Sequence, residues 1–181
     1  MGWQLDKSHS AIGFMVKHMM ISTVRGKFTD FDGMFKLDEN DLAHSYVEGV
    51  IKTASINTSD EKRDGHLRSA DFFDAEQFPT MAFHSTKVES KGNNRFHITG
   101  DLTIKGVTKQ VVFDATEEGK GKSPWGTEVW AFSAELSFNR KDFGLNWNVA
   151  LEAGGWLVGE TVKVALDLEV VKQPEAVTVA A

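Results

Sequence analysis

The chain has 181 residues, of which 25% are charged and 41% hydrophobic, and this composition is typical of one soluble globular domain. Its net charge is −6 and its basic residues are not clustered, which argues against a nucleic-acid partner because phosphate binding needs a basic surface. The absence of cysteine excludes a disulfide scaffold, a thiol nucleophile and any cysteine-based metal site.

The two ends of the chain carry little structural signal. Residues 1–6 lack a charged segment followed by an apolar run, so we expect a cytoplasmic protein, or a periplasmic one if a signal peptide has been removed. No apolar stretch is long enough to predict a membrane-spanning segment. We expect one domain over residues 1–171 and, because of Pro174 and the small residues after it, a flexible tail over 172–181.

Alternation of apolar and polar residues predicts antiparallel strands along most of the chain. The predicted strands lie near residues 10–18, 24–37, 46–56, 80–90, 96–104, 107–117, 130–138 and 158–170. In 24–37 the apolar set jumps from Phe28 to Phe31, which predicts a bulge around Gly33. Turns are predicted at 92–94, 105–106 and 119–126. About eight strands favour a closed barrel around one ligand, although a sandwich shows the same alternation.

A short helix is predicted near residues 60–74, between two of the strands. Thr58 and Glu61 have the spacing of a capping box, with Thr58 as the N-cap. Leu67, Ala70 and Phe73 recur at threes and predict one apolar face. The helix is expected to lie across one end of the barrel, or alternatively only to fill part of its core.

Several short segments, in this order along nearly the whole chain, resemble one known family. They are residues 3–10, 14–18, 24–28, 55–58, 63–74, 78–79, 83–86, 100–109, 139–145 and 158–162. In these segments the chain resembles the YceI-like family, the lipocalin-like, polyisoprenoid-binding proteins of bacteria. The resemblance implies an all-β, eight-stranded antiparallel lipocalin-like barrel with an apolar tunnel. It also implies a linear isoprenoid lipid as ligand, such as a quinone precursor or a prenyl diphosphate. Many relatives are exported.

The chain has the apolar side chains that such a tunnel requires, with 13 Phe, 5 Trp and 6 Met. Burial of a long apolar tail against them is favourable at about 25 cal/mol per Å². The predicted tunnel residues are Phe14, Val16, Phe28, Phe35, Ile51, Phe83, Leu102, Ile104, Phe113, Phe132, Leu136 and Val164. The alternative for each is ordinary core packing.

Polar candidates for contact with a head group lie near strand ends or on the helix. They are Arg63, His66, Arg25 and Arg140, because guanidinium binds phosphate with two hydrogen bonds. The alternatives are surface salt bridges for the arginines and, for His66, a bond to a backbone carbonyl that holds the helix to the barrel. Met19 and Met20 are candidates for an adaptable mouth, or for packing at a strand end.

No catalytic motif accompanies these residues. The six histidines show no close ligand pairing, no G-x-S-x-G elbow is present, and no glycine-rich loop precedes a helix. We therefore expect a lipid-binding or lipid-carrying protein with no catalytic residue, metal or cofactor, and with a homodimer as a possibility. Two alternatives stay open. One is an enzyme acting on a small hydrophobic substrate through His66 with His9 or His18, and the other is a stress-related protein whose barrel is filled and has no cavity.

Overall fold

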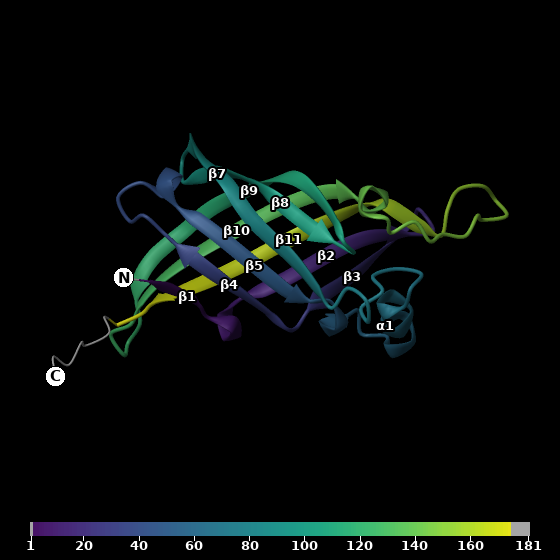
Figure 1. The fold of residues 1–181 in the computed structure, drawn as a ribbon, viewed down its shortest axis with the longest axis horizontal. Coiled ribbons are helices and arrows are strands. Elements are labelled where there is room, and N and C mark those ends of the chain that lie inside the picture. The colour runs from purple at the N-terminus through teal and green to yellow at the C-terminus, as the bar shows by residue number, and fades with distance from the viewer. Residues whose placement is uncertain (1, 175–181) are drawn as a thin grey trace.

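A computed structural model describes residues 2–174 of the chain. Eight antiparallel strands form a closed ring, in the order β1-β4-β5-β7-β8-β9-β10-β11, and β1 pairs with β11 to close it (Figure 1). Their bounds are Trp3–Leu5 (β1), Phe31–Lys36 (β4), Tyr46–Lys52 (β5), Thr80–Gly92 (β7), Arg95–Ile104 (β8), Val107–Lys122 (β9), Glu128–Asn139 (β10) and Val158–Lys172 (β11). The predicted eight-stranded barrel is confirmed.

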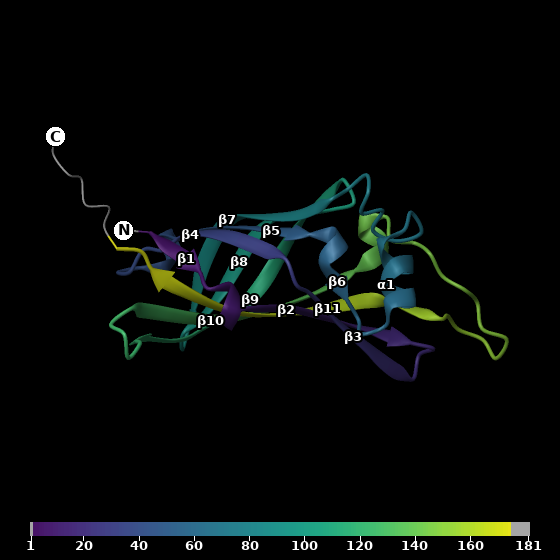
Figure 2. The ribbon, with the colours of Figure 1, turned by 90° about the horizontal axis from the view of Figure 1, so that it is seen from below.

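Three further strands continue the sheet from the part of β11 that the short β1 does not reach. They are β2 (Ala11–His18), β3 (Ser22–Phe28) and β6 (Ile56–Asn57). The helix α1 (Glu61–Arg68) follows β6 and lies at the end of the barrel where β3 and the loop before β11 are found (Figure 2). Four 3₁₀ turns complete the structure: Lys7–His9, Leu42–His44, Thr53–Ser55 and Arg140–Phe143.

The segment predicted as one bulged strand over 24–37 is two strands. β3 ends at Phe28 and β4 begins at Phe31, and Lys52 donates a backbone hydrogen bond to Asp30 at the corner between them. Gly33 lies in a regular ladder opposite Gly49, so the predicted bulge is wrong. A Cβ at Gly33 would lie 2.8 Å from the Phe35 ring, so close packing is what requires glycine there.

The predicted cap of the helix is also wrong. Asp60 is the N-cap, and its carboxylate accepts from the backbone N–H of Arg63 at 3.0 Å. Thr58 instead donates its N–H and its hydroxyl to the buried Asp64 carboxylate, at 2.8 and 2.6 Å. The helix ends at Arg68, before the last two residues of the predicted apolar face, Ala70 and Phe73, and Ala70 is exposed.

The end of the barrel opposite α1 is closed by tryptophan. The rings of Trp3 and Trp130 pack edge to face at 5.3 Å, and both are buried. The Lys120 ammonium lies 4.5 Å from the Trp130 ring centroid and 5.1 Å from that of Trp3. Glu39 holds Lys120 and Lys172 at 2.5 and 2.9 Å, which fixes both cations over the closed end.

The C-terminal strand continues into the segment predicted as a tail. Lys172 is the last residue of β11, and Gln173 donates its backbone N–H to the Gly2 carbonyl at 2.9 Å. The strand therefore reaches the end of the ring, because its last residues pair with β1. The rest of the predicted tail, residues 175–181, lies outside the described residues.

Candidate functional site

The barrel interior contains a cavity of about 430 Å³, a size within the usual range of small-molecule sites. Its wall consists almost wholly of apolar side chains, because the inward positions of every long strand are apolar. All twelve predicted tunnel residues line it: Phe14, Val16, Phe28, Phe35, Ile51, Phe83, Leu102, Ile104, Phe113, Phe132, Leu136 and Val164. The alternative with a filled barrel predicted no cavity, so the structure argues against it.

Small residues make room for the aromatic rings of the wall. A Cβ at Gly26 would lie 2.3 Å from the Phe14 ring, which packs over this glycine from the neighbouring strand. A Cβ at Gly100 would lie 2.3 Å from the carbonyl oxygen of His84 and 2.5 Å from the Phe83 ring. Glycine at these strand positions therefore lets large inward rings lie close to the sheet.

An aromatic cluster lies where α1 meets the barrel. The His66 ring packs edge to face against Trp147 at 4.6 Å and against Phe72 at 5.1 Å. His66 Nε2 lies 2.8 Å from the Asp71 carboxylate, so the alternative for this residue, a bond to a backbone carbonyl, is wrong. All three rings line the cavity. Sequence reasoning missed Trp147 because it lies in an irregular loop without periodicity.

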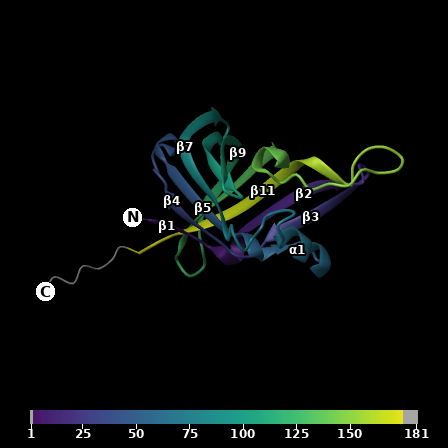
Figure 3. The same ribbon diagram turned by 45° about the vertical axis from the view of Figure 1, so that its right-hand side comes forward.

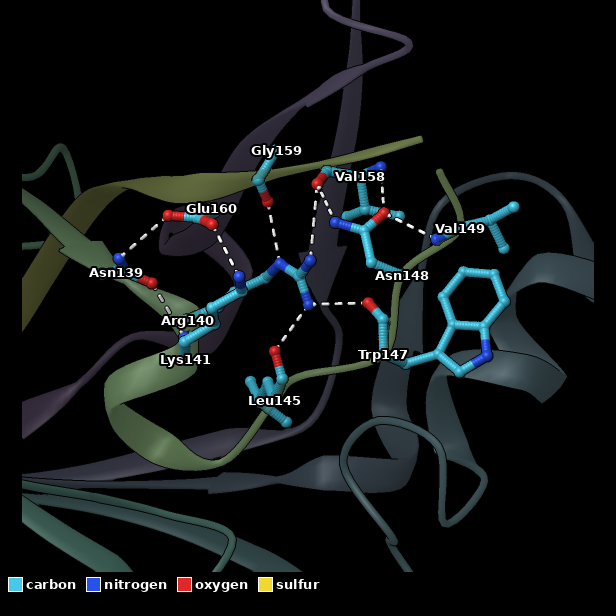
Figure 4. Close-up of polar contacts among 10 residues, drawn as sticks. All are labelled: Asn139, Arg140, Lys141, Leu145, Trp147, Asn148, Val149, Val158, Gly159 and Glu160. Atoms are coloured by element: carbon cyan, nitrogen blue, oxygen red, sulfur yellow. Dashed lines mark hydrogen bonds and ion pairs between the residues drawn. The ribbon is translucent and has the colours of Figure 1, made fainter. Parts of the chain in front are cut away.

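Arg140 is buried next to the cavity, and backbone carbonyls surround its guanidinium (Figure 4). Nε donates to Gly159 O at 2.8 Å, and Nη1 donates to the carbonyls of Leu145 and Trp147 at 2.5 and 3.0 Å. Nη2 donates to Val158 O at 3.4 Å. Burial lowers the pKa of Arg140. Because these bonds join the loop after β10 to the start of β11, the guanidinium fixes the backbone there.

The other two predicted arginines lie in different surroundings. Arg63 lines the cavity and donates from Nε to the Thr58 hydroxyl at 2.8 Å and from Nη2 to the Thr58 carbonyl at 2.9 Å. Its side chain is 41% exposed, so it is held in place yet open to solvent. Arg25 is exposed, contacts the sulfur of Met15 and does not line the cavity.

The basic and histidine residues of the wall gather at one end of the cavity. Lys17, His18, Arg63, His66 and Arg140 are all lining residues that lie at or near the α1 end. This grouping follows from contacts: His18 pairs with Val158, whose carbonyl accepts from Arg140, and Arg140 also bonds the Trp147 carbonyl beside His66.

The acidic lining residues are Asp32 and Glu48, and both are paired. A hydrogen bond from Lys7 lowers the pKa of Asp32. A hydrogen bond from Tyr46, followed by one from His84, lowers the pKa of Glu48.

Two of the basic residues at the α1 end are paired as well, because Arg63 Nη1 lies 4.0 Å from the Asp60 carboxylate and His66 Nε2 lies 2.8 Å from that of Asp71. The basic lining residues therefore outnumber the acidic ones, and they gather at the α1 end.

One group of potential metal ligands occurs in the described residues, outside the cavity. Asp6, His9 and Glu169 bring three ligand atoms together, and none of these residues lines the cavity. Hydrogen bonds from Ser8 and His9 lower the pKa of Asp6 to about 2. His9 is thus already paired and lies away from the cavity, whereas His18 and His66 both line it. No helix in the described residues is long and apolar enough to cross a bilayer.

Comparison with known proteins agrees with this architecture. A family profile described as the YceI-like domain matches residues 3–170. A UPF0312 protein of Staphylococcus aureus is 38% identical over 165 residues, which are 91% of this chain and 94% of the relative. A crystal structure of the Campylobacter jejuni YceI protein is 32% identical, with a TM-score of 0.74 over 87% of this chain and 90% of its own.

A second solved structure shares the fold at lower identity. It is a polyisoprenoid-binding domain from Saccharophagus degradans, with a TM-score of 0.68, 16% identity, and coverage of 94% of this chain and 98% of its own. The profile and the curated relative both span most of the chain, in agreement with the segments that suggested the resemblance. The chain belongs to the YceI-like family.

Proposed function

We propose that this protein binds a long isoprenoid lipid, with the apolar tail in the barrel and the polar head at the α1 end. The observation that carries the proposal is the apolar cavity inside the barrel, whose basic lining residues gather at one end. An isoprenoid tail has almost no hydrogen-bonding groups, so a wall without unpaired polar atoms suits it. In the described residues, no buried side-chain nitrogen or oxygen lacks a hydrogen-bond partner. The name of the Saccharophagus degradans domain supports the same ligand class.

The head group that fits this end is a hydrogen-bond acceptor, such as a quinone carbonyl or a diphosphate. Arg63 and His66 line the cavity and remain partly exposed, with side-chain exposures of 41% and 38%. Arg140 is less suited to this role, because backbone carbonyls already accept from three of its nitrogens. We therefore assign head-group contact to Arg63 and His66, and a structural role to Arg140.

Adjacent residues of β11 allow a matched test of the cavity. Val164 faces the cavity, and Ala165 is exposed on the outer face of the same strand. Val164→Trp places an indole in the cavity and is expected to weaken binding of a polyprenol at least about tenfold. Ala165→Trp adds the same indole outside and is expected to leave affinity unchanged. Equal affinities for the two variants would show that the tail does not lie in the barrel.

The head group is tested with three ligands that share one tail. Geranylgeraniol, a geranylgeranyl quinone and geranylgeranyl diphosphate are titrated against the wild type, Arg63→Gln and Arg25→Gln. Loss of the cation in Arg63→Gln should weaken the diphosphate most and the alcohol least, whereas Arg25→Gln should change none of them, because Arg25 lies outside the cavity. Mass spectrometry of an organic extract of the purified protein then identifies the natural ligand. A uniform response of all three ligands to Arg63→Gln would remove this residue from the head-group site.

A further inference from the structure

Two loops at the α1 end place a group of hydrophobic side chains in solvent. The β2–β3 turn exposes Met19, Met20 and Ile21, and the loop 149–157 exposes Val149 and Trp156. These five residues, defined here as the apolar tip, make up most of the nine exposed large hydrophobic residues in the described part of the chain. Figure 3 shows both loops at one end of the molecule. The Met19 backbone N–H donates to the Leu157 carbonyl at 2.8 Å, so the loops form one surface.

The backbone of the β2–β3 turn is strained by its residue types. Met19 and Met20 have φ angles of 51° and 63°, and the Ile21 N–H donates to the His18 carbonyl, which defines a type I′ turn. Such turns favour Asn-Gly, because residues other than Gly, Asn and Asp disfavour a positive φ. Two methionines here lower stability, and strain of this kind is found where a function requires the side chains. Ile21 and Met20 are 82% and 64% exposed, so packing in the core does not explain them.

The charges around the tip indicate which partner covers it. Residues 17–28 contain Lys17, Arg25 and Lys27 and no acidic residue, although the chain as a whole has a net charge of −6. Among the described residues, the Lys17 ammonium contacts the Thr23 hydroxyl and Arg25 contacts Met15, and neither forms an ion pair. The facing loop adds one carboxylate, Glu152. A symmetric contact with a second copy would bring these cations together, whereas anionic lipid would neutralise them.

We propose that the apolar tip docks on the surface of an anionic lipid bilayer. Met, Ile and Trp side chains enter the boundary between head groups and acyl chains, while lysine and arginine reach the phosphates. The tip adjoins the cavity, because Lys17, His18 and Leu157 line the cavity and flank the tip residues in the chain. Docking therefore brings the cationic end of the cavity to the membrane. Exchange of a ligand between the bilayer and the cavity would rest on the proposed function, whereas docking itself does not.

Flotation with isoprenoid-free vesicles tests the proposal. Wild-type protein is expected to float with phosphatidylcholine vesicles that contain phosphatidylglycerol, less with phosphatidylcholine alone, and less at raised salt. The double variant Met19→Asn, Met20→Gly should lose roughly tenfold or more in partitioning, because two apolar side chains no longer enter the lipid. Its unfolding midpoint should stay equal or rise, because Asn-Gly favours the turn. A loss of binding thus cannot result from unfolding.

Two tryptophans provide a matched control. Trp156 belongs to the tip, whereas Trp125 is 89% exposed in the β9–β10 turn at the opposite end of the barrel (Figure 1). Trp156→Ser should weaken partitioning, and Trp125→Ser should not. The proposal is overturned if the wild type does not float, or if the double variant floats equally well. It is also overturned if the double variant only converts a dimer to a monomer in light scattering. Because the vesicles contain no isoprenoid, failure of the proposed ligand would not alter these results.

Discussion

Replacement of Arg140 by methionine decides whether this arginine supports the fold or binds ligand. The change leaves the carbonyls of Leu145, Trp147 and Gly159 without their donor, since no other side chain is bonded to them. Val158 O keeps a bond from Asn148 at 2.8 Å. An unpaired buried acceptor costs about 1–3 kcal/mol. Release of the buried charge from its desolvation offsets part of this, so we expect Arg140→Met to lower the free energy of unfolding by about 3–5 kcal/mol.

Lys141→Met is the matched control. Lys141 is the next residue, its side chain is exposed, and it pairs with Glu160 at 2.6 Å on the surface. Such a pair contributes less than about 1 kcal/mol, so this variant should unfold close to the wild type.

Urea unfolding followed by tryptophan fluorescence gives both free energies, and the thermal midpoint of Arg140→Met should fall by roughly 10 °C. Below its midpoint, folded Arg140→Met should bind polyprenyl ligands within a few-fold of the wild type. A loss below about 1 kcal/mol, together with weaker binding of a diphosphate, would refute the structural role and restore the head-group role.

Three further changes test other parts of the structure. Gly100→Ala should destabilise by about 1–3 kcal/mol in urea unfolding, since its Cβ would meet the His84 carbonyl oxygen at 2.3 Å, whereas Gly49→Ala meets nothing within 4 Å and should cost far less. Thr58→Val removes a hydroxyl that donates one hydrogen bond and accepts another, and should cost about 1–3 kcal/mol. The Asp6 pKa of about 2 lies below its ordinary 3.8, so this carboxylate contributes stability above pH 3.8 that is lost as pH falls towards 2. With Asp6→Asn the unfolding free energy should fall less between pH 5 and 2, and equal slopes for both proteins would contradict this.

The cavity wall was predictable from sequence because a β-strand projects successive side chains to opposite faces. In β8, Phe96, Ile98, Leu102 and Ile104 follow that rule and all line the cavity. Alternation also shows where a strand stops, but it does not distinguish a bulge from a corner. The jump from Phe28 to Phe31 was therefore interpreted as a bulge, although it marks the passage from β3 to β4.

The residues at the mouth were harder to predict, because tertiary contacts define them. Trp147 lies in a loop, and only its packing against His66 shows that it lines the cavity. Arg140 carries the same charge in either role, and sequence alone does not show that carbonyls surround it. The prediction of the helix cap was wrong for a related reason. Thr58 and Asp60 are both good capping residues, but Thr58 binds the buried Asp64 carboxylate, so Asp60 is the cap.

The two ends of the barrel differ in a way that favours the α1 end as the entry for the proposed lipid. At one end Trp3 and Trp130 are buried under two lysines that share Glu39, and opening this end would break ring contacts, cation–π contacts and ion pairs together. At the α1 end the cavity is bounded by loops, whose few backbone hydrogen bonds open at lower cost than a strand ladder. A tail inserted from the α1 end reaches the tryptophan-closed end last and leaves its head among the cationic lining residues. The same end lies beside the apolar tip, so the proposed docking would bring the entry of the proposed ligand to the membrane surface.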